Sequence, residues 1–497
     1  FVLTKALGLG LPLIVVINKI DRADARAEEV LSEVYDLFID LDADEEQLEF
    51  PVLYAIGRDG IAMADPEERA EDLHVIFETI LSTVPAPTHD AEEPFQMLVA
   101  DLGYSDYLGR LAVGRIFHGT VKAGDQLVRV GADGEPKGLR VTKLHGYQGL
   151  DMVPVEAVGP GDIAVLAGLE EVQIGDTICT AAAPKALPRI SVDEPTVSMT
   201  FTINTSPLAG REGSIVQGNK IRERLEKEAL KNVAIRVEDG PGRDTMIVKG
   251  RGEFQMAIII ETLRREGFEL CVGRPEVILR KEDGVLKEPM ERLYVDLAEE
   301  FLGVVTEKLA QRKGRMVNLV NHGSGRVRAE FSVPSRGLIG YRDEFLTDTK
   351  GTGIMNSYVE GYDAYRGDFP SRYTGSIISD RQGQAVAYAL FHLEPRGRLY
   401  VRPGDDVYEG MVVGEHNREQ DIDVNPCKEK KLSNVRASGK DEAVVLTTVK
   451  PMTLERALHI IAEDEMVEVT PKSIRLRKAV LSASRRHVER GKQRKQD

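Results

Sequence analysis

The feature that most constrains the fold is an unbroken aliphatic run, Leu13–Ile17, that ends directly at the polar sequence Asn18–Asp21. Such a short, β-branched run is typical of a strand buried on both faces of a parallel sheet. Apolar residues recur at helical spacing between residues 30 and 41, and a second apolar run covers Phe50–Ile56. The sequence therefore predicts a strand–helix–strand unit at the edge of a doubly wound α/β domain, closed by a helix over residues 76–84.

The polar residues after the first run have the pattern of a guanine-binding loop. Ligands bind at the carboxyl ends of strands in open α/β sheets, which is where Asn18–Asp21 lies. The Asp21 carboxylate can accept hydrogen bonds from the ring N–H and the exocyclic amine of guanine, whereas adenine offers neither donor there. The Lys19 stem can lie along the base, and the Asn18 amide can bridge to a neighbouring loop. A polar turn that caps the next helix is the alternative interpretation.

A second wall for such a pocket is expected at the end of the next strand, in the sequence Tyr54–Arg58. There the backbone N–H groups of residues 55–57 can donate to the guanine carbonyl. Without the first motif, a plain strand-to-loop turn would explain these residues nearly as well. The candidate base-binding residues are therefore Asn18, Lys19, Asp21, Ala55, Ile56 and Gly57.

The motifs that would bind the phosphates do not occur in this sequence. No G-x-x-x-x-G-K-[ST] loop is found anywhere, and no D-x-x-G precedes Asn18 to reach a magnesium ion or position a water molecule. We therefore assign no catalytic residue in this chain. Phe1 is not an initiator residue and no signal peptide precedes the first element, so we expect the start to be internal.

Composition excludes several other classes of protein. No apolar run approaches the ~20 residues that a membrane-spanning helix needs. The 3 cysteines lie far apart and the 9 histidines are scattered, so we expect no metal site and a cytoplasmic location. The formal net charge of −16 argues against a generic nucleic-acid coat but leaves room for local RNA-binding patches.

At 497 residues the chain is too long for one hydrophobic core, and its patterns divide it into five parts. The expected fold class is multidomain α/β and β. We predict part of a P-loop-type α/β domain at 1–85, an antiparallel β-barrel at 90–187, two ferredoxin-like α/β sandwiches at 190–283 and 286–370, and a strand-rich C-terminal domain at 371–497.

Two basic segments interrupt the acidic background of the C-terminal part. One is a stretch of small polar residues that cannot form a core face and is expected to be a mobile loop with RNA-binding residues Lys428, Lys430, Lys431, Arg436 and Lys440. A solvated loop without a ligand is the alternative. The other is a group of Lys and Arg residues between 472 and 495, which stands out as a local basic patch.

Several motifs together resemble those of translational GTPases. They are Asn18–Asp21, R-I-x-x-G-x-x-x-x-G-D at 115–125, D-E-P-T-V-S-M at 193–199, G-R-G-E at 250–253 and R-R-E-G-F-E at 264–269. Taken alone, G-R-G-E could be a phosphate loop or a tight turn before a helix. Finer segments are similar to the BipA/TypA family: 204–207, 334–340, 351–353, 435–439, 468–471 and 474–477. The likeness runs through essentially the whole chain in order.

This resemblance implies a ribosome-binding GTPase with GTP or GDP and Mg²⁺ as cofactors in the full-length parent. It implies roles in large-subunit assembly and in stress or cold adaptation, with the 70S ribosome, the large subunit, rRNA and the tRNA acceptor end as partners. Residues 1–85 would be the C-terminal part of the GTPase domain, and this chain alone is expected to be inactive. We expect a monomer that does not bind membranes. The alternative is a non-catalytic ribosome- or rRNA-binding protein.

The sequence departs from the family pattern in the second guanine loop and after G-R-G-E. Ile56–Gly57 replaces the usual Ser-Ala, which keeps the backbone donor but loses a hydroxyl that would brace the loop. Phe254–Gln255 replaces a more typical Leu-His, which we expect to be a neutral change in packing.

Overall fold

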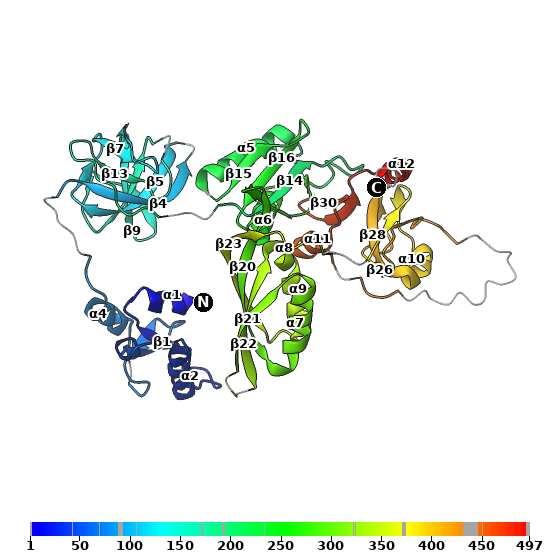
Figure 1. Ribbon diagram of the computed structural model, residues 1–497. Coiled ribbons are helices and arrows are strands. Elements are labelled where there is room, and N and C mark those ends of the chain that lie inside the picture. The colour runs from blue at the N-terminus through cyan, green and yellow to red at the C-terminus, as the bar shows by residue number, and fades with distance from the viewer. Residues whose placement is uncertain are drawn as a thin grey trace. The chain divides into compact units, whose positions relative to one another are not determined.

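The computed structural model divides the chain into two compact units, Phe1–Glu93 and Pro94–Asp497 (Figure 1). The structure describes residues 2–41, 43–68, 70–87, 93–105, 107–169, 172–190, 194–232, 234–321, 323, 325–369, 374–430, 446–449 and 451–493. We describe each unit by itself.

The first unit is a small α/β arrangement built on a parallel strand pair. Its elements are α1 (Val2–Gly8), β1 (Val15–Asn18), α2 (Ala27–Asp40), α3 (Glu45–Leu48), β2 (Val52–Ile56), β3 (Ile61–Met63) and α4 (His74–Thr83). β1 pairs with β2 in parallel and β3 pairs with β2 in antiparallel orientation. The predicted strand–helix–strand unit and its closing helix are confirmed, whereas β3 was not predicted.

The first strand differs from the prediction of burial on both faces. β1 begins at Val15, and the side chain of Val15 packs in the cluster under α2 with Leu31 and Phe38. Val16 points to the opposite face, because successive side chains alternate along a strand, and it is 40% exposed. In the described part of the first unit, β1 is therefore covered on one face only.

In the residues that the structure describes, the second unit begins with a series of antiparallel strands. They are β4 (Gln96–Ser105), β5 (Gly109–His118), β6 (Val121–Lys122), β7 (Gln126–Val130), β8 (Pro136–Arg140), β9 (Lys143–Gln148), β10 (Asp151–Pro154), β11 (Ala157–Val158), β12 (Ile163–Ala167) and β13 (Thr177–Thr180). Eight of them form one sheet in the order β10-β9-β12-β5-β4-β13-β7-β8. Met97, Ala112, Ile116, Leu166 and Ile178 are fully buried in its core. The predicted change to short antiparallel strands is confirmed.

The next segment has the predicted βαββαβ order of elements. These are β14 (Val197–Ile203), α5 (Gly218–Lys231), β15 (Arg236–Asp239), β16 (Thr245–Gly250), α6 (Glu253–Arg265) and β17 (Leu270–Val272). The strands lie in the order β15-β16-β14-β17 and all pairs are antiparallel. The first strand therefore lies between the third and the fourth.

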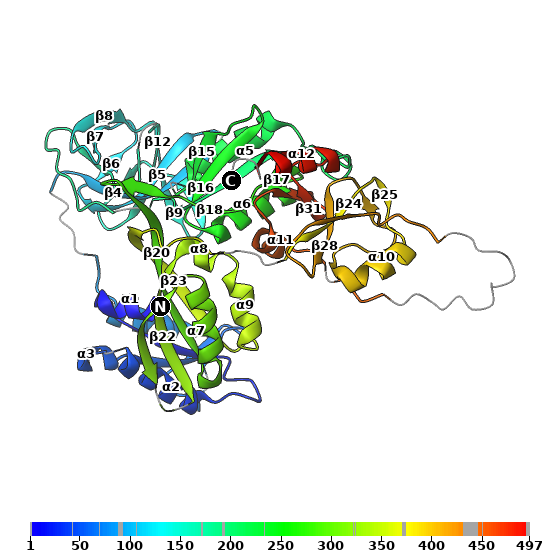
Figure 2. The same cartoon turned by 45° about the vertical axis from the view of Figure 1, so that its right-hand side comes forward.

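The same element order returns in the following segment, apart from a short extra helix. It contains β20 (Val285–Ala298), α7 (Leu302–Gln311), β21 (Arg315–Asn321), β22 (Arg326–Pro334), α8 (Ser335–Leu338), α9 (Tyr341–Asp348) and β23 (Ile354–Ala364). The strands are ordered β23-β20-β22-β21. Both α7 and α9 lie on one side of this sheet (Figure 2), and they cover a core that includes Leu293, Val305, Phe331 and Tyr341.

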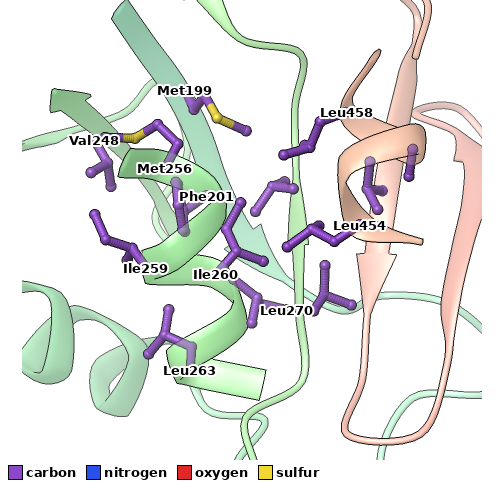
Figure 3. Packing of buried hydrophobic residues seen from close by; sticks show 14 of the residues in the cluster. Met199, Phe201, Val248, Met256, Ile259, Ile260, Leu263, Leu270, Leu454 and Leu458 are labelled. Atoms are coloured by element: carbon purple, nitrogen blue, oxygen red, sulfur yellow. The ribbon is translucent and has the colours of Figure 1, made fainter. Parts of the chain in front are cut away.

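The C-terminal strands extend the sheet of the first βαββαβ segment. β30 (Glu465–Val469) pairs with β17, β31 (Ile474–Lys478) pairs with β30, and β28 (Met411–His416), β24 (Ser376–Ser379) and β29 (Ile422–Val424) continue the order. The helices of this part are α10 (Ala387–Leu393), α11 (Leu454–Ile460) and α12 (Ala483–Gln493). Met199, Phe201 and Ile260 share one core with Leu454 and Leu458 of α11 (Figure 3). This continuity was not predicted.

The G-R-G-E sequence forms a turn before α6. Glu253 is the first residue of the helix, and its carboxylate accepts the backbone N–H of Gly340 at 3.2 Å. Gly340 has a φ of 71°, and a Cβ there would lie 1.9 Å from the ring of His459, so only glycine fits. Burial raises the pKa of Glu253 to about 7, with Glu291 and Asp343 adding to the effect. Of the two alternatives, the tight turn is the one observed.

Candidate functional site

The parallel pairing of β1 and β2 brings the two predicted guanine-loop segments together. Asn18 at the end of β1 is the partner of Ala55 in β2, and the Ile20 N–H donates to the Ala55 carbonyl oxygen at 3.5 Å. Asn18–Asp21 and residues 55–57 therefore lie at the same edge of the sheet, where ligands of α/β folds bind.

Asn18 holds this edge in place through its side-chain oxygen. Asn18 Oδ1 accepts the backbone N–H of Lys19 at 2.8 Å and that of Gly57 at 2.9 Å. Lys19 has a φ of 65°, a left-handed conformation that is uncommon for a residue other than glycine. A Cβ on Gly57 would lie 3.1 Å from Asn18 Nδ2, so the two loops approach closely. The predicted bridge from Asn18 to a neighbouring loop is thus present, and the Gly57 N–H donates to Asn18.

Arg58 ends the predicted second wall, but the sequence analysis gave it no role in the candidate site. Its guanidinium Nη2 lies 3.5 Å from Asp21 Oδ2, and its Nε lies 2.7 Å from Asp59 Oδ1. The Asp59 and Asp21 carboxylates raise the pKa of Arg58. The Asp21 side chain is 28% exposed and that of Arg58 76%. The carboxylate that would read a base therefore remains accessible, with a long, exposed cation beside it. An arginine directly after a predicted base loop is the signal that could have revealed it.

A hollow of about 460 Å³ lies next to these loops. It is lined by the residues from Val15 to Ile20 and by Arg26 and Val30 of the following segment. Lys19 lines it, but Asp21 and residues 55–57 do not. The hollow therefore lies beside the sheet edge that carries Asp21 and residues 55–57, and it is not the predicted base pocket itself.

Of the predicted RNA-binding residues, Lys428 and Lys430 fall within the described part of the chain. Both follow β29 and are exposed. Lys431, Arg436 and Lys440 lie outside the described residues. The structure therefore places the beginning of the basic segment at the surface.

Most of the basic side chains between 472 and 495 that the structure describes do not form a surface patch. Lys478 is 1% exposed, and its ammonium lies 2.8 Å from Asp421 and 3.0 Å from Glu465. Arg475, Arg477 and Arg486 are also largely buried, and Arg475 and Arg486 form ion pairs with Glu212 and Asp423. A run of charged residues in the sequence does not show which residues lie opposite it in the fold. Here acidic residues from distant segments lie opposite these basic side chains.

Segments 204–207 and 468–477 meet in a buried polar network. Glu468 is fully buried and accepts hydrogen bonds from Asn204 at 3.0 Å, Ser206 at 2.9 Å and Tyr408 at 2.5 Å. Arg475 Nη1 lies 3.2 Å from the same carboxylate. Burial, together with Glu468, raises the pKa of Tyr408. Apart from Tyr408, these structural partners belong to segments that the sequence analysis singled out only as motifs.

Two kinds of site are absent from the residues that the structure describes. No group of three or more His, Cys, Asp or Glu side chains in them has the geometry to hold a metal ion. Among their helices, none combines the length and apolarity needed to cross a membrane.

Comparison with protein families gives four matches in order along the chain. They are the elongation factor Tu GTP binding domain (1–94), elongation factor Tu domain 2 (109–179), the elongation factor G C-terminus (285–373) and the TypA/BipA C-terminal domain (374–483). This order defines an elongation-factor-like GTP-binding protein, which agrees with the loop at the end of β1.

Individual relatives show to which family of elongation-factor-like GTP-binding proteins the chain belongs. The chain is 48% identical to the large ribosomal subunit assembly factor BipA of Bacillus subtilis and 47% identical to that of Escherichia coli K12, covering 98% of this chain and 80% of each relative. The corresponding factor of Haemophilus influenzae is 45% identical, over 98% of this chain and 79% of its own length. The chain therefore belongs to the TypA/BipA family.

Proposed function

We propose that this chain belongs to a ribosome-associated GTPase that acts in assembly of the large ribosomal subunit, and that Asn18, Lys19 and Asp21 bind the guanine base. The observation that carries the proposal is the Asn18 side chain, which joins the end of β1 to the loop after β2 by hydrogen bonds to Lys19 and Gly57. A base loop needs such bracing, because the groups that read the base must not collapse onto each other when the site is empty. The ribosomal role is supported by the names of the relatives, which are large ribosomal subunit assembly factors.

In this proposal Asp21 accepts the ring N–H and the exocyclic amine of guanine. Arg58 then has to leave Asp21 or share it, which its 76% exposed side chain allows. The Lys19 stem lies along the base. Ala55, Ile56 and Gly57 form the second wall, and since the Gly57 N–H already donates to Asn18, Gly57 serves by its close approach.

The proposed cofactors are GTP or GDP with Mg²⁺. Because no G-x-x-x-x-G-K-[ST] loop occurs in this chain, its residues account for reading the base and not for hydrolysis. We propose that the chain by itself shows no ribosome-stimulated GTP turnover. Phosphoryl transfer would need residues that hold the β- and γ-phosphates.

The proposed partners are the 70S ribosome, its large subunit, rRNA and the tRNA acceptor end. We propose that the protein is a cytoplasmic monomer with a role in stress or cold adaptation. Lys428 and Lys430 are exposed, as a phosphate-binding segment requires. We assign residues 197–272 and 285–364 as ferredoxin-like sandwiches from their shared strand order. The division at 1–85, 90–187, 190–283, 286–370 and 371–497 is retained as a domain proposal.

The base assignment is tested on the chain itself by saturation-transfer NMR with free nucleosides. Guanosine should give signals and adenosine should not. In Asp21→Asn the new amide can donate to the second carbonyl of xanthine, so preference should move to xanthosine. Equal guanosine signals from both proteins would remove Asp21 from the site.

The RNA assignment is tested by neutralising Lys428, Lys430, Lys431 and Arg436 together. Each lost phosphate contact should reduce the slope of log affinity against log salt by about 0.7 to 0.9. Ribosome binding measured across a salt series should therefore become weaker and less dependent on salt. An unaltered slope would show that this segment makes no phosphate contacts.

A further inference from the structure

The sheet β23-β20-β22-β21 has one face that α7 and α9 do not cover. Leu293, Val295 and their neighbours point toward the helices, so the alternating residues point the other way. Tyr294 on β20 and Tyr358 on β23 lie on this second face, where the register pairs Tyr294 with Asn356 and Tyr358 with Arg292. Their rings are stacked, with centroids 6.1 Å apart and planes at 24°. Two tyrosines thus form a continuous aromatic surface at the outside of the sheet.

Amide and charged side chains of both signs surround the two rings, and Glu330 lies directly opposite Tyr294. The tyrosine face is defined here as Arg292, Tyr294, Asn318, Arg328, Asn356 and Tyr358, which the strand registers place on one side of the sheet. Tyr358 is 39% exposed. Asn318, from the outer strand β21, and Asn356 are exposed as well. Aromatic rings, guanidinium groups and amides are the groups that stack on nucleic-acid bases and bond to their edges.

Charge on this face favours exposed bases over a duplex. Arg328 pairs with Asp296 and Arg292 pairs with Glu360, so these carboxylates are compensated, and the Glu330 carboxylate accepts a hydrogen bond from an amide of the face. Arg315 on β21 adds an exposed positive charge at one end. A duplex would require many unpaired cations along its phosphates, whereas stacking needs ring area and only a few cations.

We propose that the tyrosine face is a docking surface for single-stranded RNA, with an unpaired base stacked on Tyr294 and Tyr358. The proposal deepens the proposed function, on which it rests for RNA as partner. It assigns RNA contact to the second βαββαβ segment, independently of the basic segment near Lys428. Four-stranded antiparallel sheets with surface aromatic residues bind RNA by this mode in other proteins.

The test uses the full chain, which contains no tryptophan. Tyr358→Trp then places the single tryptophan on the tyrosine face. The probe is an unstructured RNA of about 10 nucleotides, within the roughly 4–16 nucleotides typical of such sites. Stacking should quench the tryptophan emission in a saturable way, and the same sequence in duplex form should not. Tyr107→Trp is the control, because Tyr107 is 97% exposed and lies between β4 and β5, away from the tyrosine face. RNA should cause no saturable quenching of the tryptophan emission in this variant.

Second-site variants separate stacking from general binding. Tyr294→Leu in the Tyr358→Trp background keeps apolar area without a ring and should weaken the quenched complex roughly 5- to 150-fold. Tyr294→Phe keeps the ring and should bind as the parent does. Equal binding by the Leu and Phe variants would overturn the proposal, as would RNA binding seen by anisotropy without quenching.

Two outcomes distinguish this proposal from the proposed function. If the tyrosine variants lose affinity for ribosomes although RNA never quenches the tryptophan emission of the Tyr358→Trp variant, the face docks a protein and the RNA proposal is wrong. If guanosine is not recognised through Asp21 although RNA quenches the tryptophan emission of the Tyr358→Trp variant in a saturable way, the proposal for the tyrosine face is supported and the guanine assignment is wrong.

Discussion

Asn204 Nδ2 donates a hydrogen bond to Glu468 Oε1 at 3.0 Å, although 264 positions separate the two residues. The contact lies beside the point where β17 pairs with β30, and it joins the end of β14 to the C-terminal strands. Ser206, Tyr408 and Arg475 bind the same carboxylate. A fully buried carboxylate with this many partners fixes the register of the strands, because any other register would leave the buried charge without its partners.

Replacement of Glu468 by Gln should destabilise the second unit. The amide cannot neutralise Arg475, and its NH₂ group faces donors that need an acceptor. Breaking a buried ion pair of this kind costs about 3–5 kcal/mol. Urea unfolding followed by hydrogen exchange of the β17 and β30 amides would measure it. Glu463→Gln is the control, since its side chain is 89% exposed, and its effect should stay within about 0.5 kcal/mol. Equal losses in both variants would contradict the structural role of Glu468.

Lys478→Met should be similarly destabilising, because it leaves Asp421, Asp464 and Glu465 without their shared cation. Burial would lower the pKa of Lys478, but these carboxylates raise it above its usual 10.5. The stabilisation is therefore complete below pH 10.5 and is lost as the pH rises beyond that value. The expected cost near neutral pH is about 3–5 kcal/mol by chemical denaturation.

Lys472→Met provides the matched control for Lys478, as Lys472 is exposed on the same segment. It should leave stability unchanged. If instead Lys478→Met preserved stability and lowered only RNA binding, the interpretation of this group as a surface patch would be restored.

The element order was predictable because it depends on local periodicity. Alternation along Val197–Ile203 and helical spacing along Glu253–Arg265 identify those elements without any partner. The pairing of β17 with β30 depends on residues about two hundred positions apart, and no local pattern encodes it. Burial of Lys478 could not be predicted for the same reason, since the pattern of charges around it does not show which acidic residues lie opposite.

The candidate base site was predictable in part. The residue types at Asn18–Asp21 indicate what they could bind, and the predicted bridge from Asn18 needed only two neighbouring strands. The position of Arg58 beside Asp21 depends on the path of an exposed loop, which composition does not determine. Likewise, exposure of Val16 depends on which face α2 covers.

Glu253 makes stability depend on pH between about 4.5 and 7. Its pKa in the folded protein is about 7, against an ordinary value of 4.5, because it is buried near Glu291 and Asp343. A raised pKa means that the folded state holds the proton more tightly, so stability is full below pH 4.5 and falls as the pH rises through 7. The expected loss is about 3 kcal/mol. Glu253→Gln should remove this slope and be the more stable protein above pH 7.

The comparison between variant and wild type isolates Glu253 from its neighbours. Burial lowers the pKa of His459. The contribution of His459 to the stability of the folded protein is therefore lost as the pH falls, which is opposite to the effect of Glu253. Arg312, Asp343 and Glu344 are unchanged in both proteins. Denaturation midpoints at a series of pH values would give the difference curve, and a flat difference would exclude a proton on Glu253.

Asn18→Ala should release the loop that carries Gly57. The substitution removes the acceptor for the N–H groups of Lys19 and Gly57, and each bond contributes about 0.5–1.5 kcal/mol. Lys19 would also lose support for its left-handed conformation. Hydrogen exchange at the Gly57 amide should therefore accelerate about 2- to 12-fold. Asn18→Asp keeps an oxygen in the same place and should retain protection, so equally fast exchange in both variants would show that Asn18 does not brace this edge.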